Sequence, residues 1–318
     1  MTTGEVSVTR ARTLNALRIG LLVVIVAACV IALWANWQEV SGQLRKLSVP
    51  VVLGAFVLVA LAPVLTLMGW RVLLEDLGTH LALPPASSVF LVGQLGKYLP
   101  GSVWTVVAQA EMGAKLAVPR RRMAVVGILS LGLAVLTGCL LGIPAVQPLL
   151  ASRGDAFSWW WVAIAVALGC VLLWPRLLNA VIARGLRLLR REPLEHDLSG
   201  RAVALASAWF VAAWVSTGLG TFVLARSMAP DAPLGPLLVT CVGGFALASA
   251  AGMFSILVPA GVGVRDGVLA LLLVTLMPLP AAAAVVVVAR FFAVLADLLL
   301  AGFAWVWGRR HHLLGSTA

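Results

Sequence analysis

Two oppositely charged residues interrupt the last long apolar stretch of the chain. Residues 281–307 are nearly all apolar, and Arg290 and Asp297 are the charged residues among them. These 27 residues, at a rise of about 1.5 Å each, exceed the bilayer's hydrocarbon core of about 30 Å. A charge within such a span is costly and usually faces a cavity or a partner, and positions seven residues apart share one helical face. The sequence therefore predicts that the protein handles something polar within the membrane.

Further polar residues occur in two apolar regions that Pro and Gly interrupt. The first, about 86–115, is broken at Leu99-Pro100-Gly101, and the second, 235–278, is broken at Pro259 to Gly263. Pro removes a backbone donor and Gly tolerates positive φ, so each motif predicts a helix–break–helix segment. Such breaks persist at membrane depth where protein or water satisfies the freed backbone groups. The polar residues that these regions place at membrane depth are Gln94, Lys97, Tyr98, Ser102, Gln109, Glu111, Arg265 and Asp266.

Three of the residues at membrane depth are cations, and their chemistry suits a phosphate group. Lys97, Arg265 and Arg290 supply positive charge from three separate segments. Helices that begin after Gly101 and Gly263 would add backbone N–H donors, which also favour anions. We therefore expect the three cations to converge on one phosphate.

The two carboxylates at membrane depth admit two interpretations. In the first, Asp266 and Asp297 hold the arginines of a functional site by ion pairing, or take up a proton that couples transport. In the second, the pairs Arg290–Asp297 and Arg265–Asp266 serve only to stabilise the helical bundle, as intramembrane ion pairs sometimes do.

The composition indicates a polytopic helical membrane protein. The chain is 62% hydrophobic and 11% charged, whereas a soluble domain is about half apolar and about a quarter charged. Its apolar runs are continuous rather than alternating, which favours helices over a β-barrel. The longest polar segment, 176–201, is too short for a soluble catalytic domain, so residues 1–318 are expected to form a single integral membrane domain.

The expected fold is an all-α bundle of about six full spans plus two broken, re-entrant helical regions. Tryptophans cluster near the ends of the spans, as in the aromatic belt at headgroup depth. The N-terminal apolar run follows three arginines without a convincing cleavage site, so it is expected to be an uncleaved span. The predicted spans are 19–37, 51–70, 123–143, 158–174, 202–224 and 281–307.

The distribution of basic residues predicts the orientation. If residues 1–18 are cytoplasmic, sixteen Lys and Arg fall on that side and four on the other, which is a strong positive-inside signal. The tail, 308–318, is then cytoplasmic too, in the plasma membrane. The first broken region must begin and end in the cytoplasm and the second outside, which resembles an inverted-repeat transporter with a site between broken helices. The alternative is two ordinary helix pairs, since residues 235–257 alone could cross the bilayer.

Residues 176–201 form a different kind of segment. Leu177, Val181 and Leu188 alternate with arginines such as Arg184 and Arg187 in a roughly helical rhythm. This pattern predicts a cytoplasmic amphipathic helix lying on anionic headgroups. The alternative is an extended span with a solvated basic end.

Several functional classes are disfavoured. The net charge of +11 comes from basic residues that flank apolar spans, so we expect no nucleic-acid partner. No Ser/His/Asp set, metal cluster or phosphate loop occurs, so no catalytic residue, metal or cofactor is predicted. A membrane transferase would want a paired acidic motif, for which Glu75-Asp76 is the only candidate. Four single cysteines without disulfide or metal spacing are interpreted as packing residues: Cys29, Cys139, Cys170 and Cys241.

Two motifs carry a resemblance to a known family. The segment GQLGKYLPGSVWTVVAQAEMGAKLAVPRRR and the downstream segment VPAGVGVRDGVLALLL resemble the lysylphosphatidylglycerol synthase transmembrane-region family. That family comprises a flippase-like membrane domain found alone or fused to a cytoplasmic aminoacyl-transfer domain. Many relatives have Glu at the position of Asp266, and many carry Gly-Glu after the first Pro, where Ser102-Val103 stands here. The positions that match the two motifs are Lys97, Pro100, Gly101, Pro259, Gly261, Gly263, Arg265 and Asp266.

The resemblance implies a membrane domain that moves or binds a lipid with a polar head. We expect a lipid translocase or lipid-binding protein whose partners are anionic or polyprenyl-phosphate lipids. The aminoacyl-transfer domain does not occur in these residues, so lipid synthesis is not expected. The alternatives are an accessory subunit of a separate lipid or glycosyl transferase and, less favoured, a membrane transferase itself. The predicted headgroup-binding residues are Lys97, Tyr98, Pro100, Gly101, Gly261, Gly263, Arg265, Asp266, Arg290 and Asp297.

Overall fold

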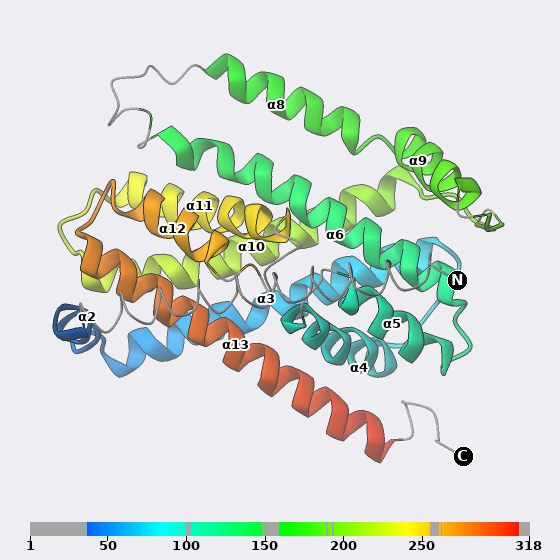
Figure 1. The fold of residues 1–318 in the computed structure, drawn as a ribbon, viewed down its shortest axis with the longest axis horizontal. Coiled ribbons are helices and arrows are strands. Elements are labelled where there is room, and N and C mark those ends of the chain that lie inside the picture. The colour runs from blue at the N-terminus through cyan, green and yellow to red at the C-terminus, as the bar shows by residue number, and fades with distance from the viewer. Residues whose placement is uncertain are drawn as a thin grey trace, which may run out of the picture.

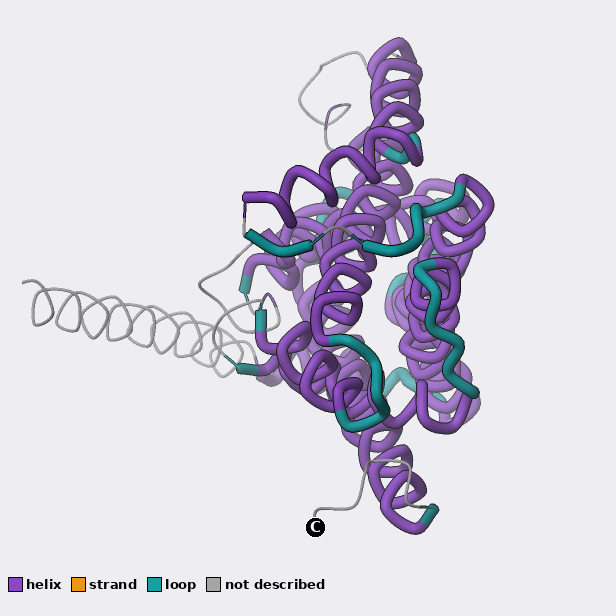
Figure 2. The backbone as a smooth tube through the Cα atoms, turned by 90° about the vertical axis from the view of Figure 1, so that its right-hand side faces the viewer, coloured by secondary structure: helices purple, strands orange, loops and turns teal. Residues whose placement is uncertain are grey.

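The computed structural model describes residues 37–99, 103–147, 150, 159–188, 190–192, 194–254, 261 and 263–311. The described residues contain helices and no strand, which confirms an all-α helical bundle (Figures 1 and 2). The predicted span 19–37 up to residue 36, the break residues Pro100, Gly101 and Pro259, and the tail beyond residue 311 lie outside the described residues. The helices are α2 (Trp37–Leu44), α3 (Val49–Asp76), α4 (Leu83–Gly93), η1 (Gln94–Tyr98), α5 (Trp104–Ala114), α6 (Arg120–Gly142), η2 (Ile143–Val146), α8 (Trp159–Leu172), α9 (Pro175–Leu188), α10 (Gly200–Met228), α11 (Leu234–Phe254), α12 (Val264–Leu273) and α13 (Leu279–Arg310).

Five of the described helices are long and apolar enough to cross a membrane: α3, α6 continued by η2, α10, α11 and α13. Four of them correspond to predicted spans, and the fifth, α11, belongs to the second broken region. Helix α8, within the predicted span 158–174, has 14 residues. These rise about 21 Å, which is less than the thickness of the hydrocarbon core.

The centre of the bundle is built on α3, α6, α10 and α11, which pack closely through small residues. A hydrogen bond joins α10 to α3, in which the Ser216 hydroxyl donates to the Leu58 carbonyl at 2.7 Å. Where α10 meets α11, a Cβ added to Gly218 would lie 2.4 Å from Val242 Cα, so the two backbones approach as closely as glycine permits. Small residues at such contacts are typical of membrane helix packing.

Polar contacts define one end of the bundle, which we call the basic end. Buried Arg122 at the start of α6 donates to the Gly78 carbonyl and pairs with Glu195, both at 2.8 Å. Asp76 at the end of α3 accepts from the Ser199 backbone N–H at 2.7 Å, just before α10 begins. The start of α4 and the end of α13 meet at this end too, since Ser88 donates to the Ala304 carbonyl at 3.1 Å.

Two helical hairpins enter the bundle from opposite ends (Figure 1). The first hairpin (α4, η1 and α5, residues 83–114) begins and finishes at the basic end. The second hairpin (α11 and α12, residues 234–273) begins after α10 and leads into α13 at the opposite end. Its arms are antiparallel, because Cβ atoms added to Gly252 and Gly244 would lie 3.3 Å from Gly261 Cα and 3.1 Å from Leu272 Cδ1. The second region therefore folds back on itself in two antiparallel helices, of which α11 alone is long enough to cross.

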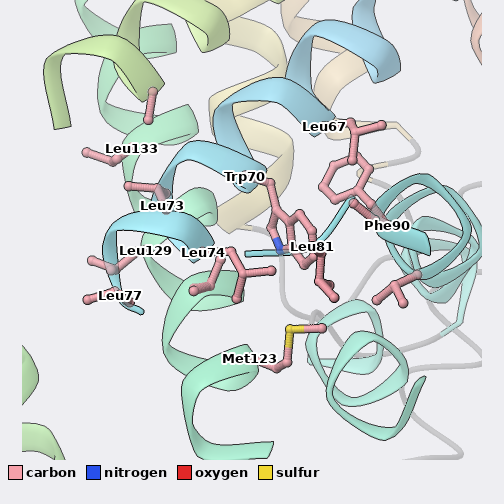
Figure 3. Packing of buried hydrophobic residues seen from close by; sticks show 14 of the residues in the cluster. Leu67, Trp70, Leu73, Leu74, Leu77, Leu81, Phe90, Met123, Leu129 and Leu133 are labelled. Carbon is pink, nitrogen blue, oxygen red and sulfur yellow. The ribbon is translucent and has the colours of Figure 1, made fainter. Parts of the chain in front are cut away.

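Each hairpin packs into its own apolar cluster. The first cluster joins the first hairpin to the end of α3 and the start of α6, with Trp70 and Phe90 at its centre and their rings 5.5 Å apart (Figure 3). The second cluster joins the second hairpin to the starts of α3 and α13 and includes Leu273 and Val285. Burial of these side chains fixes where the hairpin tips lie.

Helices α8 and α9 lie on one flank of the bundle, and the last turns of α13 project from the opposite flank (Figures 1 and 2). Helix α9 occupies the first part of the segment predicted to be amphipathic. Its side chains Leu177, Val181 and Leu188 are exposed, while Asn179 exchanges two hydrogen bonds with the Leu198 backbone, at 2.9 and 3.0 Å. Contact of α9 with lipid headgroups stays a prediction.

Candidate functional site

A cavity of about 300 Å³ lies where the two hairpin tips meet α13 in the middle of the bundle. Its wall is mostly apolar and receives residues from α3, α4, α5, α6, α10 and both hairpins. The three predicted cations, Lys97, Arg265 and Arg290, all line it. So do Tyr98, Gly261 and Asp297 from the predicted set. Residues up to 200 positions apart in the chain are thus brought to one place, as the hypothesis of a single site requires.

The tip of the first hairpin is tied to α13 by Asp297. Lys97 Nζ lies 2.7 Å from Asp297 Oδ2, and the Tyr98 hydroxyl donates to the same oxygen at 2.6 Å. The Asp297 side chain is only 5% exposed, whereas Lys97 is 37% exposed and reaches the carboxylate from the cavity. Because a buried carboxylate is stable only when it is paired, these two donors explain how Asp297 can lie within a membrane span.

The second hairpin is tied to α13 by Asp266. Arg265 Nε lies 3.4 Å and the guanidinium of Arg290 3.7 Å from Asp266 Oδ1. The other oxygen accepts from the Gly263 backbone N–H at 3.2 Å, as a carboxylate does at the start of a helix. Arg265 also lies over the Phe245 ring at 5.5 Å. Asp266 thus fixes two of the three cations without itself lining the cavity.

The observed ion pairs differ from the expected pairing in part. The expected contact between Arg265 and Asp266 is confirmed. In place of the expected pair of Arg290 with Asp297, Asp297 pairs with Lys97 of the first hairpin. Arg290 pairs with Asp266 of the second hairpin. The physical reason is that residues seven apart are separated by about 10 Å along a helix axis, whereas pairs within a helix join residues three or four apart. Asp297 and Arg290 of α13 therefore pair with different hairpins.

The glycines of the second break have distinct roles. Gly261 lines the cavity with φ of +64°, and a Cβ there would lie 2.9 Å from Gly252 Cα. Gly263, at φ of +81°, precedes α12, as predicted for a helix that begins at this point. Its N–H is occupied by Asp266, however, so it does not offer the cavity a free donor.

The other polar residues of the first region divide into two groups. Gln94 and Gln109 line the cavity. Glu111 instead lies exposed near the basic end, where Arg120 donates to it twice at 2.8 Å. This bidentate contact holds the pKa of Glu111 below its usual range. Ser102 lies outside the described residues.

Besides Gln94 and Gln109, the cavity wall contains neutral polar residues that the sequence did not reveal. Trp70, Ser130 and Ser249 line the cavity and are almost fully buried. The indole nitrogen of Trp70 and the hydroxyls of both serines have no hydrogen-bond partner among the described residues. A serine in a long apolar span is a weak signal, because most such hydroxyls donate to a carbonyl of their own helix, as Thr137 does to the Leu133 carbonyl.

A proline adds a backbone acceptor to this wall. Pro63 lies inside α3 and has no N–H, so the Val59 carbonyl lacks its usual donor within the helix. Both residues line the cavity. The site therefore combines a cluster of cations with neutral hydrogen-bonding groups in an apolar wall, which is the composition of a pocket for a polar anion. No group of three His, Cys, Asp or Glu side chains suited to a metal ion occurs in the part of the chain that the structure describes.

The fold and the cavity define an integral helical membrane protein with two oppositely oriented hairpins around a cationic site. The chain belongs to the lysylphosphatidylglycerol synthase transmembrane-region family, whose sequence profile, described as Lysylphosphatidylglycerol synthase TM region, matches residues 18–301. The match includes both hairpins and all the cavity-lining residues. A search of curated proteins finds no significant match to the chain. Membership relates the protein to lipid modification or lipid flipping.

Proposed function

We propose that the protein binds the phosphate-bearing head of a membrane lipid in this cavity and moves it between the leaflets. The observation that supports the proposal best is the presence of three cations, Lys97, Arg265 and Arg290, from three separate segments around one cavity. Cations are costly inside a membrane, so three in one place are best explained by an anion that they bind. A lipid phosphate is the anion that the bilayer itself supplies.

The hairpins suggest how movement takes place. They enter from opposite ends and meet at the site, as broken helices do in transporters that alternate access around a central site. An arriving phosphate competes with Asp297 for Lys97 and with Asp266 for Arg290, because each of these cations pairs with a carboxylate. Displacing either contact loosens one hairpin from α13, which opens the site toward one leaflet.

Reconstitution into liposomes tests this function. The assay measures how much of an acyl-labelled fluorescent anionic lipid becomes accessible to dithionite in the presence of the purified protein. Arg290→Gln and Lys97→Gln retain size and hydrogen bonding, and each is expected to lower the rate about tenfold or more by removing a charge from the site. Arg120→Gln is the matched control, because Arg120 is exposed and pairs with Glu111 away from the cavity.

Each outcome of this assay is informative. If Arg120→Gln alone slows the movement, or if wild type moves no anionic or polyprenyl-phosphate lipid, lipid translocation is wrong. Movement that appears only with a co-purified transferase supports an accessory subunit instead, a role that the exposed basic helix α9 would suit as a docking surface. Turnover of an activated sugar donor supports a membrane transferase.

We further propose that the basic end faces the cytoplasm, with both termini there, in the plasma membrane. This is supported by the positive-inside rule, because the loops and helix ends gathered at the basic end carry most of the Lys and Arg residues. Single cysteines at positions 120 and 190, both exposed, are expected to resist an impermeant thiol reagent added to intact cells and to react after permeabilisation. Labelling of either position from outside would reverse the orientation.

A further inference from the structure

We infer that the cavity selects a lipid with a single negative charge, a phosphodiester whose other substituent is an uncharged, hydroxyl-bearing group. Asp297 sets this selectivity by limiting the positive charge of the site. The inference rests on the proposed function and narrows its substrate class. It separates phosphodiester lipids with a polyol or sugar head from phosphomonoesters and from zwitterionic or cationic head groups.

The net charge of the site favours a ligand with one negative charge. Three cations, Lys97, Arg265 and Arg290, stand against two carboxylates, Asp266 and Asp297, which leaves one net positive charge. No other charged residue among those that the structure describes lines the cavity, and residues 100–102 and 255–262, at the two breaks, carry no charge in the sequence. A phosphodiester, with one negative charge, neutralises this site. A phosphomonoester carries about 1.5 to 2 negative charges near pH 7 and would leave an excess inside a poorly solvated cavity.

Neither carboxylate of the site is available for a cationic head group. Asp297 already accepts from Lys97 and Tyr98, and Asp266 accepts from Arg265 and the Gly263 N–H and pairs with Arg290. An ammonium from an ethanolamine, choline or aminoacyl head would enter a cavity with three cations and would find both anions occupied. Like charges at such distances are repulsive, so these heads are disfavoured.

The neutral polar groups of the cavity wall favour a head group that bears hydroxyls. The hydroxyls of Ser130 and Ser249, on residues 8% and 7% exposed, lack partners among the described residues, and so does Trp70 Nε1. Leaving a buried polar group unpaired costs about 1–3 kcal/mol, so a ligand that supplies partners after a rotation of the serine side chains is favoured. Gln94 and Gln109 add amides, and the Val59 carbonyl adds an acceptor. Donors and acceptors without net charge match hydroxyl groups, which both donate and accept.

Changes of one charge in either direction test the selectivity. Asp297→Asn raises the net charge of the site to two while keeping an acceptor for Lys97 and Tyr98, and Gln94→Glu lowers it to zero with no change of shape. The probes are short-chain phosphatidylglycerol, phosphatidate and phosphatidylethanolamine, and binding to the detergent-purified protein is measured at about pH 8, where phosphatidate is doubly charged. Wild type is expected to prefer phosphatidylglycerol.

The expected shifts run in opposite directions. Asp297→Asn should move the affinity ratio of phosphatidate to phosphatidylglycerol upward by about tenfold, and Gln94→Glu should move the ratio of phosphatidylethanolamine to phosphatidylglycerol upward by a similar factor. Glu192→Gln, which removes an exposed carboxylate far from the cavity, should change neither ratio. Thermal unfolding of each variant identifies one that fails to fold, and the other variant then decides the question.

The results separate the two proposals. If wild type moves labelled lipids in liposomes but binds the three probes equally, or if neither folded variant shifts its ratio, the charge selectivity is wrong and translocation stands. If wild type prefers phosphatidate, the net charge of the site does not determine which lipid binds, and the proposed selectivity is wrong. If wild type moves no lipid at all, the proposed function fails, and the selectivity that rests on it fails too.

Discussion

The two hairpins attach to the same helix with opposite charge polarity. The first hairpin brings a cation, Lys97, to an anion of α13, Asp297; the second brings an anion, Asp266, to a cation of α13, Arg290. The arms of the first hairpin have 11 residues each, while those of the second have 21 and 10. The two hairpins therefore reach the same cavity with helices of different length. What they share is an ion pair to α13, not the length of their arms.

The difference in polarity shows what α13 does. Because Arg290 and Asp297, the two charged residues in the apolar part of α13, pair with different hairpins, a shift of this helix would change both attachments together. A variant that alters one of these ion pairs therefore tests one hairpin while the attachment of the other is kept.

The largest loss of stability is expected when the anion of the Lys97–Asp297 pair is replaced by a cation. Asp297→Lys places a fourth cation beside Lys97 in the cavity, with the carboxylate lost. Breaking a buried pair in this way costs about 3–5 kcal/mol, so the variant should unfold at a much lower temperature or fail to accumulate.

The double variant Lys97→Asp with Asp297→Lys restores a pair and gives the first hairpin the polarity of the second. It should recover most of the lost stability in a double-mutant cycle monitored by thermal unfolding in detergent. If the double variant is no more stable than Asp297→Lys alone, the attachment does not depend on this pair.

The close packing of the hairpin arms gives the next largest effect. A Cβ on Gly96 would lie 2.6 Å from the Thr105 backbone nitrogen, so Gly96→Ala must push the two arms of the first hairpin apart. Overpacking of this kind costs about 1–3 kcal/mol. In the second hairpin, Gly252→Ala meets its neighbours only at 3.2 Å and should cost less.

Gly267→Ala provides the matched control for this packing. Nothing lies within 4 Å of the added atom, and the residue is in the interior of α12, where alanine favours a helix by about 0.5–1 kcal/mol. It should leave the melting temperature unchanged or raise it. If Gly267→Ala lowers the melting temperature as much as Gly96→Ala does, close contact between the helices is not the reason that Gly96→Ala destabilises the protein.

The sequence allowed much of this arrangement to be predicted, for identifiable reasons. Arg290 and Asp297 stand out because charge is rare in a membrane span, and both breaks are visible because proline and glycine interrupt long apolar runs. The convergence of Lys97, Arg265 and Arg290 on one cavity follows from breaks that enter from opposite ends.

Other features depend on three-dimensional packing and could not be predicted. Which carboxylate pairs with which cation is decided by the relative depth of three helices, and no local pattern encodes it. Helix α11 has the length and composition of a full crossing, and its antiparallel packing against α12 is seen only in the folded chain. Ser130 and Ser249 resemble ordinary buried residues of a span, because their environment is set by what lies across the cavity.

A smaller effect is expected from the neutral donor of the first attachment. Tyr98→Phe removes the hydroxyl that donates to Asp297 at 2.6 Å and leaves Lys97 in place. The loss should be about 1 kcal/mol, seen as a lower melting temperature, with lipid movement reduced less than in Lys97→Gln. The second hairpin uses the Gly263 backbone N–H for the same purpose, so no side-chain substitution there removes its donor. An effect of Tyr98→Phe as large as that of Lys97→Gln would show that the hydroxyl itself is required at the site.

The smallest effect is expected at the base of the first hairpin, where the Glu111–Arg120 pair is exposed rather than buried. Its hydrogen bonds lower the pKa of Glu111, so the pair adds stability above the pKa of an unperturbed glutamate, and that stability is lost as the pH falls through the lowered pKa. Solvent screens exposed pairs, so Glu111→Gln should leave the melting temperature at pH 7 nearly unchanged. Comparing wild type with this variant from pH 7 down to about pH 3 should show a slightly steeper loss in wild type, confined to the range below about pH 4.5. If Glu111→Gln instead destabilises the protein at pH 7 as much as the loss of the Lys97–Asp297 pair does, then burial is not what distinguishes the tip of the hairpin from its base, and the special role assigned to the cavity ion pairs would have to be abandoned.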